Sequence, residues 1–170
     1  MATYVARLRA VNVGGTGKLT MADLKALCAE LGFSRIETYI ASGNVVFDCD
    51  LSPQSVQTKL AARLLADAGK PVGVLLRTAG EMAAILRTQP FPDRDPKQTY
   101  AFFLDAKPAA EVLVDVRGRD REEIHLGTRE IYVYYPKGMG QSKLRIPAAA
   151  AGTARNLNTV AKLAELSARQ

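Results

Sequence analysis

The sequence predicts an α+β protein in which helices pack on antiparallel sheets. Two kinds of apolar pattern lead to this class. Residues 3–13 alternate apolar side chains with mixed ones, as a strand with one apolar face does. Residues 20–31 instead repeat apolar side chains at helical spacing, which predicts an amphipathic helix. With 170 residues, of which 48% are hydrophobic, the chain is long enough to bury a core.

The first helix has signals at both of its ends. Thr20 is followed three positions later by Asp23, which resembles a capping box with Asp in place of Glu. Gly32 is expected to end the helix because glycine adopts the left-handed conformation without a steric cost. Two strands should follow in residues 36–49, around a turn at residues 42–44.

A second helix and a fourth strand complete this half of the chain. Ser52 is the expected N-cap, Pro53 suits the first helical position and Gly69 suits the end. Residues 71–77 then have the composition of a strand. The order β-α-β-β-α-β is that of a ferredoxin-like unit, which we expect to occupy residues 1–77.

The remaining residues, 78–170, are expected to form a second α+β unit with C-terminal helices. Its expected elements are a helix at 79–87, a proline-rich turn at 88–98, a strand at 99–104, a short helix at 108–116, a hairpin at 122–135 around Gly127, a glycine-rich loop at 136–144 and a helical end interrupted at 151–153. The strand pair again lies in the middle. The sequence therefore predicts two ferredoxin-like units related by topology, without visible repetition of residues.

Positive charge is concentrated in two stretches. The net charge is +6, and residues 1–22 and 131–164 contain basic residues but no acidic ones. Such clustering favours an anionic partner, although two solvated faces that lack acids would give the same pattern.

The stretch "RAVNVGGTGKLT", residues 9–20, resembles a phosphate-binding loop. A Walker A loop fails here because Asn12 stands where its first glycine belongs and Leu19 where its hydroxyl belongs. The glycine spacing of a dinucleotide fingerprint is also absent. A strand, a glycine-rich loop and a helix N-terminus remain, and this arrangement either presents N–H groups to an anion or is only a tight turn.

Four blocks carry a resemblance to a known family. They are "NVGGTGKLTMADLKALCAELGF", "TYIASGNVVF", "SKL" and "TARNLNTVAKLAEL", and in this order they resemble the bacterial family called domain of unknown function 1697. The resemblance implies a two-part protein with ferredoxin-like units and implies no established activity. The chain departs from the pattern at Ala10, Ala41 and Leu157, where Gly, Gln and Trp are usual, and the missing Trp weakens any argument for base stacking there.

Three of these blocks lie in the acid-free stretches, and their amides, hydroxyls and cations suit an oxyanion. The candidate anion-binding residues, with one from the second block, are Asn12, Gly14, Gly15, Lys18, Asn44, Ser142, Lys143, Arg155, Asn156 and Asn158. The alternative is that residues 153–159 are an elaborate helix start with Thr153 as the cap. We expect no metal and no cofactor, since the chain has one histidine and no metal-ligand spacing of its two cysteines.

Other residues favour structural roles. His125 is expected on a solvent face, Cys28 in a core and Cys49 at a strand end without a nucleophilic role. Residues 117–123 are expected to form a solvated turn because their charges balance. The tyrosines of residues 132–135 suit either packing or ring stacking.

We therefore expect a protein that binds a small phosphorylated or carboxylated ligand. The alternatives are an RNA or single-stranded DNA binder that uses Arg7 and Arg9, and a structural protein without a ligand. Enzyme status stays open, since the matched blocks contain no evident base. No apolar stretch is long enough for a membrane span, and the cysteine usage favours a reduced, cytoplasmic setting.

Overall fold

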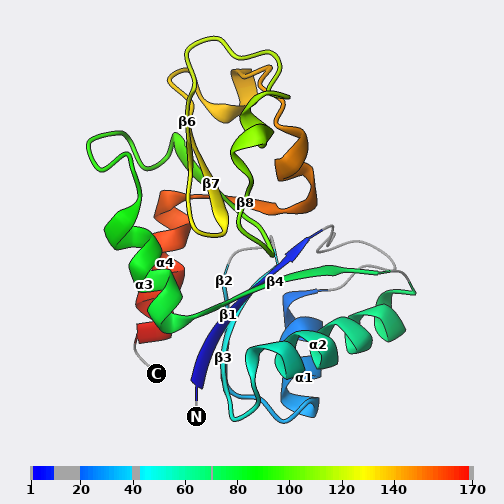
Figure 1. Cartoon of the computed structure of the whole chain (residues 1–170). Coiled ribbons are helices and arrows are strands. Elements are labelled where there is room, and N and C mark those ends of the chain that lie inside the picture. Colours follow the sequence, from blue (N-terminus) through cyan, green and yellow to red (C-terminus); the bar gives the residue numbers. More distant parts are fainter. Residues whose placement is uncertain (1, 10–19, 40–42, 70, 169–170) are drawn as a thin grey trace. The chain divides into compact units, whose positions relative to one another are not determined.

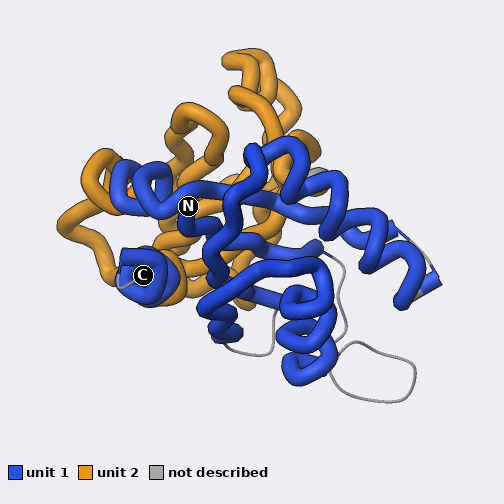
Figure 2. The backbone as a smooth tube through the Cα atoms, turned by 90° about the horizontal axis from the view of Figure 1, so that it is seen from below, with its two compact units in different colours: residues 1–84, 162–170 blue, residues 85–161 orange. Residues whose placement is uncertain are grey.

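The computed structural model describes residues 2–9, 20–39, 43–69 and 71–168. The chain forms two compact units (Figure 2): unit 1 comprises residues 1–84 and 162–170, and unit 2 comprises residues 85–161. The division falls inside two helices, α3 (Ala79–Thr88) and α4 (Leu157–Ala168). The expected domain limits, 1–77 for the first ferredoxin-like unit and 78–170 for the second α+β unit, stay predictions.

Unit 1 contains a four-stranded antiparallel sheet in the order β2-β3-β1-β4 (Figure 1). The central strand β1 (Ala2–Arg9) pairs with β3 (Asn44–Cys49) on one side and β4 (Gly73–Thr78) on the other. Strand β2 (Ser34–Tyr39) pairs with β3 at the edge. This order is that of a ferredoxin-like unit, so the predicted fold class is confirmed.

The helix signals of unit 1 act where the sequence places them. Helix α1 (Met21–Glu30) begins with a capping box in which Thr20 and Asp23 each accept the other's backbone N–H. Helix α2 (Pro53–Ala68) follows Ser52 as its N-cap. It ends at Gly69, whose φ of 73° is left-handed. These ends are determined by local chemistry, which is why the sequence predicts them.

One face of the first sheet packs against helices α1 and α2. From β1, this face contributes Tyr4, Ala6 and Leu8, and the same core contains Leu24, Leu27 and Cys28 from α1. The rings of Phe33 and Phe47 stack there at 4.3 Å between centroids. Burial of each large apolar side chain contributes about 1.5–3 kcal/mol. Cys28 is thus a core residue, as predicted, and burial raises the pKa of its thiol to about 12.

Unit 2 repeats the topology of unit 1. Its sheet has the order β6-β7-β5-β8, so β5 (Thr99–Phe103) takes the central place. It pairs antiparallel with β7 (Glu130–Tyr134) and β8 (Thr153–Asn156), and β6 (Glu123–Leu126) lies at the edge. The second ferredoxin-like unit predicted from the sequence is therefore present.

The crossovers of unit 2 differ from those of unit 1. Residues 104–122 and 135–152 contain short 3-10 turns and no α-helix, and a bridge between Arg117 and Arg145 joins them. The short helix expected at 108–116 is only the 3-10 turn Ala110–Leu113. The turns cover an apolar core that includes Ile131, Val133, Leu144 and Ile146.

The prediction of a helical C-terminal segment is wrong for residues 153–156. Thr153–Asn156 forms strand β8, so Thr153 is not the cap of the last helix. These four residues pair with β5, and this tertiary pairing outweighs their weak local preference.

A repetition of residues becomes visible at the end of the fourth strand of each sheet. Arg77 and Arg155 both precede the last residue of that strand, and each donates Nη1 to the carbonyl of the preceding residue at 2.9 Å. The last residues, Thr78 and Asn156, each accept the N–H of the residue three positions further on, in the following helix. The two strand-to-helix junctions are therefore built alike.

Replacement of either junction cap should cost similar stability. We expect Thr78→Ala and Asn156→Ala each to lower the free energy of unfolding by about 1 kcal/mol, the usual loss for a helix cap. Urea unfolding would measure both. Asn158→Ala is the control, because Asn158 is exposed and should change stability by less than about 0.5 kcal/mol. A larger loss from Asn158→Ala than from Asn156→Ala would contradict the capping geometry.

Candidate ligand pocket

The two faces of the second sheet have different chemistry. The face toward the crossovers is apolar, whereas the opposite face carries a row of four residues across the strands. Cross-strand pairing places His125 beside Tyr132, Tyr132 beside Ala101, and Ala101 beside Arg155. The small alanine separates two polar side chains on one face. This face is therefore the chemically richer side of unit 2.

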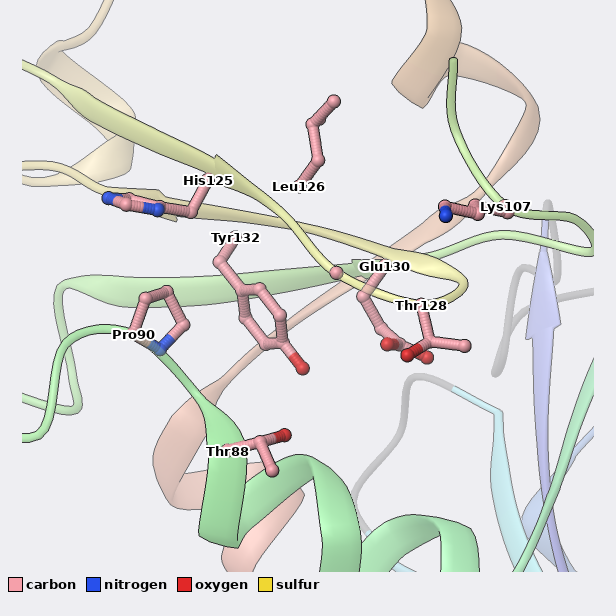
Figure 3. Close-up of a pocket in the computed structure, with 9 residues that line it drawn as sticks. Thr88, Pro90, Lys107, His125, Leu126, Thr128, Glu130 and Tyr132 are labelled. Carbon is pink, nitrogen blue, oxygen red and sulfur yellow. The ribbon is translucent and has the colours of Figure 1, made fainter. Parts of the chain in front are cut away.

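A pocket of about 520 Å³ opens on this side of unit 2 (Figure 3). It is lined by Thr88, Pro90, Lys107, His125, Leu126, Gly127, Thr128, Glu130 and Tyr132. Its volume lies within the roughly 300–1,000 Å³ that is usual for small-molecule sites. The lining residues come from the end of α3, the segment after β5 and the β6–β7 hairpin.

The polar side chains lie at different places in the pocket. The hydroxyl of Tyr132 points toward the side chain of Thr88, and the carboxylate of Glu130 lies beside Thr128 (Figure 3). Lys107 and His125 lie apart from each other in this view. Both are exposed, and within the described ranges Lys107 makes no ion pair. The pocket thus presents one cation whose charge no carboxylate of that part of the chain neutralises.

The proline-rich segment 88–98 lines one end of this pocket with Thr88 and Pro90. Phe91 is buried and meets the His125 ring edge-on, with 5.3 Å between the ring centroids. Arg94 lies 5.0 Å from the centroid of the Tyr134 ring and forms an ion pair of 2.8 Å with Glu123. The imidazole is therefore packed on one side and open on the other. The prediction that His125 is exposed is confirmed, but the sequence did not reveal that it lines a pocket.

Gly127 permits the hairpin turn to approach the pocket closely. Its N–H donates to the Glu130 carbonyl at 2.7 Å. A Cβ at this position would lie 2.7 Å from Cε2 of Tyr132 and 3.2 Å from Oε1 of Glu130. A side chain at residue 127 would therefore displace the tyrosine ring from its present place.

The site residues selected from the sequence fall into several places. Asn12, Gly14, Gly15 and Lys18 lie outside the described residues. Asn44 is buried in unit 1, where its Nδ2 donates to the Tyr39 carbonyl at 3.0 Å. None of the selected residues that the structure describes lines the pocket.

Ser142 has a structural role that its sequence context did not show. Its hydroxyl donates to Oε2 of Glu122 at 2.7 Å and accepts the Leu144 N–H at 3.0 Å. Glu122 is only 7% exposed, so the expectation of a wholly solvated turn at 117–123 is wrong for this residue. Balanced charge in the sequence does not show which carboxylate a neighbouring segment will cover. Lys143, next to Ser142, is exposed.

Burial and hydrogen bonding oppose each other at Glu122. Burial acts to raise the pKa of this carboxyl, but hydrogen bonds from the Asp120 backbone N–H and the Ser142 hydroxyl lower it more strongly. The net result is a pKa below the usual 4.5. The carboxylate is therefore the form that the fold stabilises.

Arg155 is the selected residue with the most altered chemistry. Burial lowers the pKa of its guanidinium to about 10, so the group is still charged at neutral pH. It shares the sheet face of Tyr132, two strands away. Asn156 caps α4, and Asn158 is exposed.

The nucleic-acid interpretation loses one of its two arginines. Arg7 is fully buried, and its Nη1 lies 3.4 Å from Sδ of Met82 in α3. It therefore cannot contact a phosphate backbone as expected. The physical reason is that Arg7 points to the face of β1 opposite Tyr4, Ala6 and Leu8, and Met82 of α3 packs against its guanidinium there. Arg9, at the strand end, is exposed.

The described part of the chain holds neither a cluster of metal ligands nor a membrane-spanning helix. No three His, Cys, Asp or Glu side chains gather there as a metal site requires. None of the helices described is both long and apolar enough to cross a membrane.

The fold defines an α+β protein of two ferredoxin-like units with a polar pocket in the second. The chain belongs to the family described as protein of unknown function (DUF1697), whose model matches residues 1–132. A solved structure with a similar fold is that of the conserved bacterial protein SP0830 from Streptococcus pneumoniae. It is 23% identical, the similarity covers 98% of both chains, and the TM-score is 0.79. A search of curated proteins finds no match.

Removal of the Ser142 hydroxyl should destabilise the protein in a pH-dependent way. The folded state lowers the pKa of Glu122, so the ionised Glu122 carboxylate stabilises the fold at neutral pH. This stabilisation is lost as the pH falls through the lowered pKa of the folded state. We expect Ser142→Ala to cost about 1.5–3 kcal/mol at pH 7, the usual cost of losing a hydrogen bond to a charged group. The loss should shrink in acid. Urea unfolding at neutral and acidic pH would measure it, and an equal loss at both would show that the Glu122 carboxylate is not involved.

Proposed function

We propose that this protein binds a small phosphorylated or carboxylated ligand in the pocket of unit 2. The observation that carries the proposal is a pocket of ligand size with an ammonium group, that of Lys107, which makes no ion pair within the described ranges. Small-molecule sites are typically concave and have few, well-placed polar groups. An anionic ligand would supply the negative charge that pairs with the Lys107 ammonium.

Neighbouring donors support the same ligand class. His125 and Thr128 are both exposed on the pocket lining and present an imidazole and a hydroxyl. Solvent screens an exposed ammonium, so its charge alone gives weak binding. Charge-assisted hydrogen bonds from several groups to one oxyanion are stronger. We therefore expect the anionic group to bind near Lys107 and to use these donors as well.

The residues selected from the sequence form a second candidate site for the same class of ligand. Lys18 and the glycine-rich loop would act with Lys143 and Arg155 in that arrangement. Arg155 favours it most, because burial lowers the pKa of its guanidinium to about 10, and strongly shifted pKa values cluster at functional sites. No reaction is assigned to either site. A cytoplasmic location of the protein stays part of the proposal.

Nucleic acid is the less favoured ligand. Arg7 is buried, which leaves Arg9 as the exposed arginine of the expected phosphate contacts. Backbone phosphate binding would depend steeply on salt concentration.

Two lysine variants distinguish the candidate sites. We expect Lys107→Ala to weaken the binding of glycerol 3-phosphate or malate about tenfold or more, since a charged hydrogen bond contributes about 1.5–3 kcal/mol. Lys143→Ala should leave binding unchanged, because Lys143 is exposed and does not line the pocket. Isothermal titration calorimetry would measure both.

The opposite pattern, with loss only in Lys143→Ala, would move the site to the residues selected from the sequence. Unchanged binding in both variants would contradict the pocket and the second site alike. A short single-stranded RNA tested at low and high salt is the control for the nucleic-acid alternative.

A further inference from the structure

We infer that the ligand is a nucleoside monophosphate, whose phosphate binds at Lys107 and whose base stacks on the His125 ring at the other end of the pocket. This inference rests on the proposed function, because it takes the anionic group at Lys107 from there. It adds the chemistry of the rest of the ligand. Three features of the pocket support it: its volume, the packed imidazole at one end, and the separation of that imidazole from the cation.

The pocket is larger than an anionic group. Its volume of about 520 Å³ is that of a site for a whole small molecule, so a phosphate at Lys107 would fill only part of it. Among the described residues that line the pocket, Lys107 is the one lysine or arginine. The lining therefore favours a single phosphate on a larger body over a chain of phosphates.

A packed aromatic ring forms one end of the pocket. His125 is exposed there, and the buried Phe91 meets its imidazole edge-on with 5.3 Å between the ring centroids. Pro90, the neighbour of Phe91 in the chain, lines the pocket as well. A ring that a buried residue already restrains loses little conformational entropy when a ligand ring stacks on it. Stacking of bases on aromatic side chains, histidine included, recurs in nucleotide recognition. This end of the pocket therefore suits a flat ligand ring.

The ring and the cation lie apart. In the view of Figure 3, Lys107 and His125 are on opposite sides of the pocket, with Tyr132 and Glu130 between them. An aryl phosphate keeps its ring and its phosphate adjacent, so it suits only one of the two ends. In a nucleotide the sugar separates the base from the phosphate. A nucleoside monophosphate therefore matches the two ends of the pocket better than an aryl phosphate does.

The middle of the pocket contributes shape rather than selectivity. Thr88, Glu130 and Tyr132 already make other interactions within the protein, and Glu130 and Tyr132 are almost fully buried. The exposed Lys107 and His125 lie at the ends. These two side chains therefore determine which ligand binds.

Three matched ligands test the inference by calorimetry on the full chain. Adenosine monophosphate carries both groups, ribose 5-phosphate lacks the base, and adenosine lacks the phosphate. We expect adenosine monophosphate to bind at least about tenfold more tightly than either of the others, a factor that stacking on an aromatic ring can supply. His125→Ala should abolish its advantage over ribose 5-phosphate. His125→Phe keeps a ring at this exposed position and should retain that advantage.

A lysine variant tests the other end of the pocket. Lys107→Ala should weaken the binding of adenosine monophosphate and ribose 5-phosphate about tenfold or more and leave the binding of adenosine unchanged. Lys97→Ala is the matched control, because Lys97 is exposed and does not line the pocket. It should leave the binding of all three ligands unchanged.

The outcomes separate the failure of this inference from the failure of the proposed function. Equal binding of adenosine monophosphate and ribose 5-phosphate, both weakened by Lys107→Ala, would overturn the stacked base and leave the proposed function standing. Phenyl phosphate that binds as tightly as adenosine monophosphate would overturn the need for a sugar between the two groups. Loss of the preference in His125→Phe as well as in His125→Ala would overturn stacking in favour of a hydrogen bond to the imidazole. Phosphate binding that does not depend on Lys107 would overturn both.

Discussion

The hydrogen bonding of the central strand on both of its edges is the constraint on which the rest of the structure depends. Strand β1 lies between β3 and β4, and β5 lies between β7 and β8. Neither central strand has a free edge, so both are fixed within their sheets, and their side chains alternate between the two sheet faces as in any strand. In each unit one face became the apolar core. In unit 2 the other face carries the row of His125, Tyr132, Ala101 and Arg155.

Much of unit 1 could be predicted because its signals are local. The capping box at Thr20, the proline after Ser52 and the glycine at 69 all act on backbone within a few residues of themselves. Unit 2 was harder because its elements depend on partners far along the chain. Strand β8 has only four residues, and it is a strand because β5 pairs with it. The sequence also did not show that Arg77 and Arg155 are equivalent, since the segments around them differ.

The candidate pocket could not be predicted for a related reason. Its lining combines residues 88, 90, 107, 125–128, 130 and 132, and each polar member alone has the pattern of an ordinary surface residue. Alternation placed His125 on the exposed face, but no pattern shows that Phe91 packs against its ring. In the same way, Ser142 belongs to a family block and carries a hydroxyl, yet its partner is the distant Glu122. Side-chain chemistry suggests what a residue can bind, whereas the tertiary contacts determine whether it is already in use.

The 3-10 turns that replace α-helices in unit 2 have a consequence for motion. Helix α2 holds its amides in a continuous run of hydrogen bonds, but the segments 104–122 and 135–152 rely on isolated turns and on the bridge between Arg117 and Arg145. Amide hydrogens in such segments exchange with solvent through small local openings, at a lower free energy than those of a helix or a central strand. The cover of the second sheet is therefore the part of unit 2 that opens first, while the strands beneath it stay paired. Lys107 belongs to that cover, so an anion held at Lys107 would slow the exchange of the amides around it.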